Sequence, residues 1–214
     1  MIGDILIINK NHIKAATQIV DLIYTKIIDS RNKFVITIAG ESGSGKSEIA
    51  ASVANLLDKK NINTFIFQQD DYFIYPPKTN AKIRKENINF VGISEVRLNL
   101  INKEIKEILL GRKEITKPLV MFDQNIINTE IINFDETKVL IIEGTYTTIL
   151  NNVNQHIFID RNYTDTLKSR KKRNREKQDD WLEKILLIEH KIISSHKSKA
   201  DIIVKKDYSV TVIN

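Results

Sequence analysis

The sequence predicts a three-layer α/β fold, in which helices cover both faces of a mostly parallel central sheet, with a further helix at the N-terminal end. Two features of the chain predict this fold. Short apolar, β-branched segments alternate with segments whose apolar residues recur at helical spacing. The strand-like segments are apolar at consecutive positions, as strands buried on both faces are. A length of 214 residues with 42% hydrophobic residues suits one domain of ordinary size and excludes two large ones.

The N-terminal segment predicts one amphipathic helix. Apolar residues recur at helical spacing over residues 12–29, and Asn11 can cap the start of this helix. We expect it to pack on the rest of the protein as an extension, so we divide the chain into residues 1–32 and 33–214. The segment lacks a basic start followed by an unbroken apolar stretch, and no part of the chain is apolar for long enough to span a bilayer. We therefore expect no signal peptide, no membrane contact and a cytoplasmic location.

The other elements follow in alternation. Residues 34–39 and 63–68 are the first two predicted strands, and residues 48–60 form a helix between them. The prolines at 76 and 77 interrupt regular structure, so we predict that residues 76–92 form an irregular polar excursion outside the sheet. The later elements are a helix over 94–110 capped by Ser94, a hairpin of 117–122 with 126–134, strands over 139–142 and 156–159, a basic helix, a helix over 180–194 and a strand over 201–204.

Charge and cysteine content restrict the function classes. The chain has no cysteine, which excludes a disulfide framework, a thiolate metal site and a cysteine nucleophile. Its net charge is +6, and residues 161–177 hold eight Lys or Arg against two acids, so the whole excess lies in this segment. We predict a helix that starts at Tyr163 or Thr164, within a basic region that extends to about residue 180. Tyr163 is the only aromatic residue of 161–177, which argues against a nucleic-acid surface there.

A glycine-rich loop is the strongest functional signal. Residues 40–47 match G-x-x-x-x-G-K-[ST] in full, between a predicted buried strand and a predicted helix. In such a loop the backbone N–H groups turn toward a phosphate group, Lys46 reaches the β- and γ-phosphates, and the Ser47 hydroxyl binds Mg²⁺. The alternative is a strand-to-helix turn that binds nothing, and the complete pattern with its flanks disfavours it. We predict that ATP is bound by Gly40, Glu41, Ser42, Gly43, Ser44, Gly45, Lys46 and Ser47, and that the Mg²⁺ bound with it contacts Ser47.

Two acids lie directly beyond predicted strands. Asp70 follows the second strand, and Glu143 follows the strand over 139–142. Because the carboxyl ends of parallel strands share one edge of the sheet with the glycine-rich loop, we expect both acids to face that loop. We assign Asp70 as the base that accepts a proton from an acceptor hydroxyl and as a metal neighbour, and Glu143 as a metal ligand with Ser47. The alternative for each is a solvated acid at a strand end, which we favour for Asp71.

The chain resembles the phosphoribulokinase/uridine kinase family of P-loop kinases over roughly residues 33–206. The resemblance rests on the loop 40–47, on Gln69-Asp70-Asp71-Tyr72-Phe73, on Ile142-Glu143-Gly144, on Phe158-Ile159-Asp160 before the basic helix, and on Lys199-Ala200-Asp201-Ile202-Ile203. It implies a P-loop kinase domain over 33–214 with a lid at about 161–180. It also implies that Asp70 is the catalytic aspartate, that Glu143 is the second acid near Mg²⁺, and that Arg170 and Arg173 contact phosphate.

The resemblance implies ATP-dependent phosphorylation of a hydroxyl group on a small molecule. The chain departs from uridine kinases in the acceptor region: residues 90–93 replace a D-H-P motif, and Val120 and Asn125 stand where a tyrosine and a histidine are expected. A nucleoside, pantothenate or a sugar phosphate therefore all remain candidate acceptors. The alternative function is an ATP-binding switch without a small-molecule acceptor. A homo-oligomer in which the N-terminal extension forms an interface is a further possibility.

Overall fold

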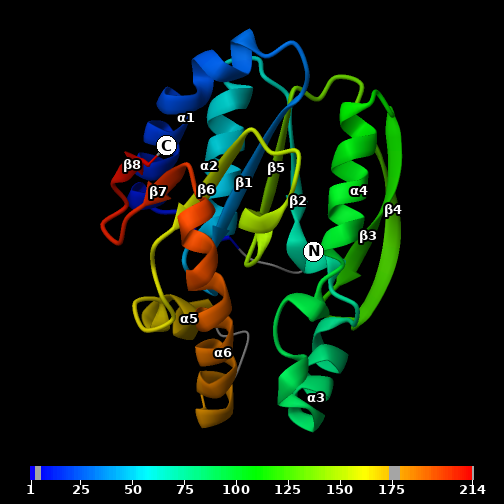
Figure 1. The fold of residues 1–214 in the computed structure, drawn as a ribbon, viewed down its shortest axis with the longest axis vertical. Coiled ribbons are helices and arrows are strands. Elements are labelled where there is room, and N and C mark those ends of the chain that lie inside the picture. The colour runs from blue at the N-terminus through cyan, green and yellow to red at the C-terminus, as the bar shows by residue number, and fades with distance from the viewer. Residues whose placement is uncertain (3–5, 174–178, 214) are drawn as a thin grey trace.

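A six-stranded sheet lies at the centre of the molecule in the computed structural model, which describes residues 1–2, 6–173 and 179–213, with Arg173 described by its backbone alone (Figure 1). The strand order is β2-β5-β1-β6-β7-β8, and all neighbouring pairs are parallel except β7 with β8. The predicted α/β fold with a mostly parallel sheet is thus confirmed. The strands are β1 (Phe34–Gly40), β2 (Thr64–Gln68), β5 (Val139–Gly144), β6 (Gln155–Ile159), β7 (Ile202–Val204) and β8 (Val210–Val212).

Helices cover both faces of this sheet and create two hydrophobic clusters. On one face, α1 (Lys10–Asp29) packs against α2 (Lys46–Asp58), and their apolar residues share a cluster with Ile36 and Ile38 of β1. On the other face, α4 (Leu98–Leu109) and the end of α6 (Asp180–His196) share a cluster with Val35 and Ala39 of the same strand. Successive residues of β1 thus face opposite layers, which is why the whole strand is apolar.

The N-terminal helix is built into one of these layers. Ala15, Ala16 and Ile19 of α1 are fully buried in the cluster that also contains α2 and β1. The helix is capped by Asn9 instead of Asn11, because the Asn9 side chain accepts hydrogen bonds from the backbone N–H groups of residues 11 and 12. The division of the chain at residue 32 stays a prediction.

Several element boundaries differ from those expected. Residues 77–86 form a helix, α3 (Pro77–Glu86), where we predicted an irregular excursion. Proline is well tolerated at the first position of a helix because its missing N–H has no partner there in any case. The helix α4 begins at Leu98, and Ser94 lies in the short 3₁₀ turn before it. The basic helix α5 (Leu167–Arg173) begins later than predicted, and β8 was not predicted.

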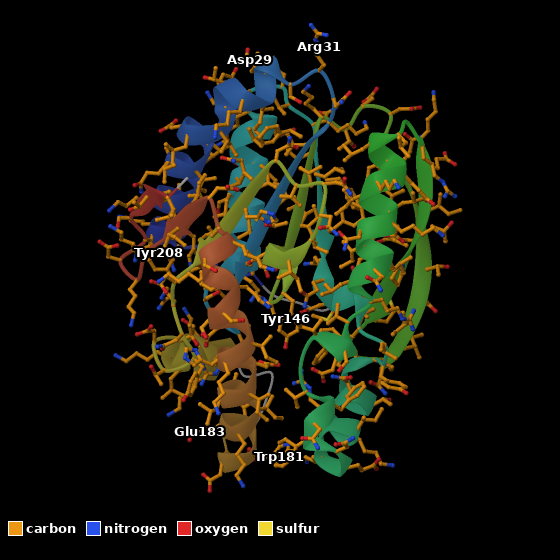
Figure 2. All side chains as sticks on the ribbon, in the orientation of Figure 1. Asp29, Arg31, Tyr146, Trp181, Glu183 and Tyr208 are labelled. Atoms are coloured by element: carbon orange, nitrogen blue, oxygen red, sulfur yellow. The ribbon has the colours of Figure 1, made fainter. Side chains whose placement is uncertain are left out.

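The remaining two strands form a separate hairpin beside α4. As predicted, β3 (Glu114–Met121) pairs with β4 (Ile126–Asn133) in an antiparallel arrangement. Figure 1 shows this hairpin at the edge of the molecule, with α3 and α6 extending below the carboxyl ends of the central strands. Trp181 is half-buried at the end of α6 that lies farthest from the sheet (Figure 2). Among the described residues, no helix has the length and apolar character needed to cross a membrane.

Candidate active site

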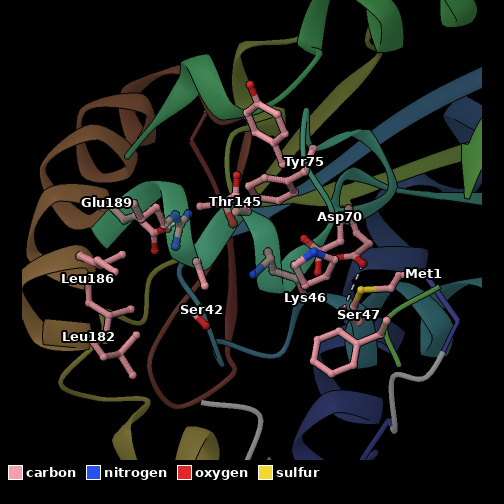
Figure 3. A pocket seen from close by; sticks show the side chains of 18 residues that line it. Met1, Ser42, Lys46, Ser47, Asp70, Tyr75, Thr145, Leu182, Leu186 and Glu189 are labelled. Atoms are coloured by element: carbon pink, nitrogen blue, oxygen red, sulfur yellow. Dashed lines mark hydrogen bonds and ion pairs between the residues drawn. The ribbon is translucent and has the colours of Figure 1, made fainter. Parts of the chain in front are cut away.

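The strand order brings three functional segments to one edge of the sheet. The strand β5 lies between β1 and β2, and Glu143 near its end lies opposite both Ile38 of β1 and Gln68 of β2. The glycine-rich loop follows β1, and Asp70 follows β2 by two residues. Accordingly, the side chains of Lys46, Ser47, Asp70 and Glu143 line one pocket (Figure 3).

The backbone of the glycine-rich loop adopts conformations that only glycine tolerates well. Gly43 and Gly45 have φ angles of 72° and 103°, and Gly45 is the N-cap of α2 without a side-chain hydrogen bond to the first turn. This N-terminal end of α2 carries no side-chain cap, and such an end of a helix favours an anion. The Ser44 hydroxyl is fully buried and has no hydrogen-bond partner among the described residues. Lys46 lies across this loop, where its Nζ donates to the carbonyl oxygen of Glu41 at 3.0 Å.

The oxygen atoms beside this loop suit a magnesium ion. The Ser47 hydroxyl donates to Oε1 of Glu143 at 3.1 Å, and Asp70 lines the same pocket. Mg²⁺ prefers oxygen ligands and is usually held by one or two carboxylates together with substrate phosphates and water. Among the described residues, no group of three or more His, Asp or Glu side chains is arranged to hold a metal without such a substrate. Ser47 and Glu143 fit a metal that arrives with a nucleotide, and Asp70 lies in the same pocket.

The basic helix α5 packs on the outside of the glycine-rich loop. Arg170 is buried, and a Cβ atom added to Gly43 would lie 2.8 Å from its Cγ. Its guanidinium donates to Thr166 Oγ1 at 2.7 Å and to the carbonyl oxygen of Tyr163, and Thr166 Oγ1 donates to the carbonyl oxygen of Ser42. Arg170 thus contacts the loop without being one of the described residues that line the pocket. The side chain of Arg173 lies outside the described residues, so its predicted phosphate contact stays a prediction.

The two consecutive acids after β2 have different surroundings. Asp70 is half-buried and lines the pocket, whereas Asp71 is buried. Asp71 accepts hydrogen bonds from Lys117 Nζ at 3.0 Å and from the backbone N–H of Val120 at 2.9 Å, and it forms an ion pair with the amino group of Met1 at 2.8 Å. Asp71 therefore joins the 3₁₀ turn Gln69–Tyr72 to the hairpin, and our expectation of a solvated acid at this position is wrong, because its carboxylate is buried among these partners.

Gly144 allows the turn that carries Asp70 to approach β5. Gln69 is fully buried and its Oε1 accepts a hydrogen bond from the backbone N–H of Tyr146 at 2.8 Å. A Cβ atom on Gly144 would lie 2.2 Å from Cβ of Gln69, which is too close for any side chain. The close packing of Gln69 against Gly144 thus sets the distance between the segments of Asp70 and Glu143.

We expect the substitution Gly144→Ala to destabilise the protein by about 1–3 kcal/mol, because the added methyl group overpacks this contact. Urea unfolding followed by circular dichroism measures the change. Since the turn of Asp70 must shift to make room for the methyl group, the Mg²⁺ concentration that the purified variant needs for half-maximal product formation should also change. An unchanged unfolding midpoint would show that the backbone absorbs the methyl group without cost.

The buried carboxyl group of Glu104 contacts the last residue of the 3₁₀ turn Gln69–Tyr72. Tyr72 is fully buried, and its hydroxyl donates to Oε2 of Glu104 on α4 at 2.5 Å. Burial raises the pKa of Glu104 from 4.5 to about 7. The burial also raises the pKa of Tyr72, so its hydroxyl stays protonated as a donor.

The pKa of Glu104 predicts a pH dependence of stability. The pKa of Glu104 is higher in the folded state than in the unfolded state. The stabilisation that this difference gives the folded protein is therefore complete below about pH 4.5 and is lost as the pH rises to about 7. Relative to Glu104→Gln, the wild type should lose up to about 3 kcal/mol of unfolding free energy over this range. Urea unfolding at a series of pH values measures the difference. Glu136→Gln, at an exposed position, is the control, and parallel pH profiles of wild type and Glu104→Gln would contradict the prediction.

The other end of the pocket lies between α3 and α6. Arg84 of α3 forms an ion pair with the buried Glu95. Nη2 of Arg84 donates to Oε2 of Glu95 at 2.8 Å and to Oε1 of Glu189 on α6 at 2.9 Å. Asn80 donates to Glu95 at 3.0 Å, which leaves its buried Oδ1 without a partner among the described residues. Apolar side chains of the pocket lining include Phe73, Tyr75, Phe122, Leu182, Ile185 and Leu186.

Sequence reasoning missed this second end. Arg84 lies in the segment predicted as irregular, and Glu189 is separated from it by more than a hundred residues, so no local pattern links them. The positions compared with a nucleoside pocket lie elsewhere: Val120 is buried beside Asp71, and Asn125 accepts a hydrogen bond from the backbone N–H of Lys78 at 2.7 Å. Proline at the first position of α3 is the one signal that could have revealed this helix.

Comparison with known proteins identifies the family. The model of the phosphoribulokinase/uridine kinase family matches residues 35–210. The chain belongs to this family. A uridine kinase from Mycoplasma pneumoniae is 26% identical over 188 residues, which cover 83% of this chain and 87% of that protein. A uridine kinase from Ureaplasma parvum serovar 3 is 28% identical over 128 residues, so the match spans only 60% of the length of either protein.

Solved structures share the fold of this phosphoribulokinase/uridine kinase family member at low sequence identity. A structure described as a possible uridine kinase from Bacillus stearothermophilus superposes with a TM-score of 0.61 at 13% identity, and the match covers 87% of this chain and 97% of the other. This similarity establishes the P-loop kinase type of fold for the chain. The acceptor molecule is a separate question.

Proposed function

We propose that the protein transfers the γ-phosphoryl group of ATP to a hydroxyl group of a small, uncharged molecule, as a uridine kinase does. The observation that carries the proposal is the single pocket that Lys46, Ser47, Asp70 and Glu143 share with the residues between α3 and α6. One end of this pocket has the chemistry for a triphosphate with Mg²⁺, and the other end has room for an acceptor. The family and the names of its members support the same reaction class.

In the proposed reaction, the loop N–H groups and Lys46 hold the triphosphate, and Asp70 orients the acceptor hydroxyl. The hydroxyl oxygen forms a bond to the γ-phosphorus while the bond from that phosphorus to the bridging oxygen breaks, so ADP leaves. Asp70 accepts the hydroxyl proton as this bond forms. Bound Mg²⁺, held by Ser47 and Glu143, would neutralise charge on the phosphate oxygens. Arg170 is proposed to support the loop that binds the phosphates.

The charges at the acceptor end favour an uncharged molecule. Arg84 is the cation of this end, and it is already paired with two carboxylates, Glu95 and Glu189. A phosphate or carboxylate group on the acceptor would need a cation with free charge, and it would also be repelled by Asp70. The unpartnered Oδ1 of Asn80 and the carboxylate oxygens are hydrogen-bond acceptors, which suit hydroxyl or N–H groups.

The test is an acceptor panel with purified protein and Mg·ATP, read by the mass of the phosphorylated product. The panel pairs uncharged compounds, uridine and cytidine first and then free sugars, with anionic ones such as pentose phosphates and pantothenate. We expect a mass gain of one phosphoryl group on an uncharged member. Turnover of anionic members alone would overturn the acceptor class, and slow ATP hydrolysis without any product would favour the ATP-binding switch.

A further inference from the structure

The glycine-rich loop contains a carboxylate at its second position. Glu41 is 5% exposed, so its charge is largely removed from solvent. Its Oε2 accepts a hydrogen bond from the backbone N–H of Tyr163 at 2.6 Å, just before α5. Its Oε1 lies 2.6 Å from Nδ1 of His190 on α6. Glu41 therefore joins the loop to the segment before α5 and to α6.

A carboxylate in a phosphate-binding loop opposes the function of that loop unless its charge is compensated. A buried negative charge repels a triphosphate bound nearby, and this repulsion is weakly screened where water is excluded. His190 is placed to compensate this charge, because its Nδ1 lies 2.6 Å from Oε1 of Glu41. Because a carboxylate only accepts hydrogen bonds, Nδ1 of His190 must carry the hydrogen in this contact.

The position of His190 on α6 connects the two ends of the pocket. The preceding residue, Glu189, accepts a hydrogen bond from Arg84 at the acceptor end. Two consecutive residues of one helix thus contact the nucleotide loop and the acceptor end respectively. The ring of Tyr163 lies 5.7 Å from the His190 ring, which places the start of the lid against the same contact.

We propose that His190 is a positioning residue that neutralises Glu41 and so sets the affinity of the loop for a triphosphate, which makes nucleotide affinity depend on the placement of α6. The inference rests on the proposed ATP site. It goes beyond that site because it assigns roles to two residues that neither the loop pattern nor the family motifs require. It also predicts a specific energetic relation: removing His190 is harmful only while the Glu41 carboxylate is present.

The experiment is a double-mutant cycle on Mg·ATP affinity, measured by calorimetry on the full chain. The variants are Glu41→Gln, His190→Asn and the two combined. Asparagine can place an N–H near the position of Nδ1 but carries no charge. We expect His190→Asn to weaken Mg·ATP binding about tenfold, Glu41→Gln to bind at least as tightly as wild type, and the double variant to return to within about twofold of wild type.

The control is Lys191→Ala, which removes a cation from the neighbouring exposed position of α6. Its Mg·ATP affinity should stay within about twofold of wild type, because a general charge effect is screened by solvent there. Thermal unfolding of each variant confirms that it is folded before its affinity is compared.

Each other outcome overturns the inference in a distinguishable way. If His190→Asn binds Mg·ATP as wild type does, the charge of His190 has no role. If the double variant binds as weakly as His190→Asn, the histidine has a purely structural role. If wild type itself binds no Mg·ATP, both the proposed function and this inference are wrong.

Discussion

Replacement of Asp70 by asparagine is expected to lower the rate of phosphoryl transfer by about 10²–10⁴-fold while Mg·ATP still binds. Asparagine has the shape of aspartate but does not accept a proton from the acceptor hydroxyl. Asp70 lines the pocket beside Lys46 and Glu143, so the loss falls on the reaction step. Product formation at saturating Mg·ATP measures the rate, and calorimetry measures nucleotide binding separately.

Asp123→Asn is the matched control for this substitution. This substitution makes the same chemical change in the exposed turn of the hairpin, where Asp123 follows Phe122 of the pocket wall. We expect its rate to stay within about twofold of wild type, as for most exposed substitutions. If Asp70→Asn retained more than about a tenth of the wild-type rate, the assignment of Asp70 as the base would be wrong.

The parts of the fold that could be predicted are those encoded by local patterns. The segments around Ile36 and Ile141 are apolar at consecutive positions, and both are central parallel strands. The glycine-rich loop was recognisable because its residues act through the backbone over eight consecutive positions. One general rule, that the carboxyl ends of parallel strands meet at one edge, was then sufficient to expect Asp70 and Glu143 in the same place as the loop.

The acceptor end could not be predicted because its contacts join distant and polar segments. The helix α3 has no apolar periodicity, and its one buried residue is Asn80. Its orientation is set by the ion pairs of Arg84 with Glu95 and Glu189, which only the folded chain brings together. The same is true of Glu41, because an acid at the second position of the loop gives no indication of a partner on α6.

The basic segment illustrates a second limit of sequence reasoning. Eight cations lie between residues 161 and 177, and composition alone does not distinguish those that face the loop from those that face solvent. The helix α5 starts at Leu167, which brings Arg170 against Gly43, whereas Lys171 and Lys172 are exposed. A shift of one residue in the helix start rotates every side chain by about 100°, and helix ends are the least certain part of such a prediction.

The substitution Lys46→Met is expected to lower the rate of product formation by about 10²–10³-fold and to weaken Mg·ATP binding as well. Methionine keeps much of the length of the side chain but removes the charge that would stabilise the transferred phosphoryl group. In the structure Nζ of Lys46 donates to the carbonyl oxygen of Glu41 at 3.0 Å, so the side chain already lies along the loop. Rates at increasing Mg·ATP separate the effect on binding from that on transfer.

Lys59→Met is the matched control, because Lys59 is exposed at the opposite end of the same helix. Its activity should match wild type within about twofold. Lys46 and Asp70 act on different steps of the proposed reaction, so their variants should differ in one respect: Lys46→Met loses affinity for Mg·ATP, whereas Asp70→Asn retains it. If the two variants instead lost nucleotide affinity equally, Asp70 would be a ligand of the nucleotide-bound metal, and the proton acceptor would have to be sought among the carboxylates at the acceptor end.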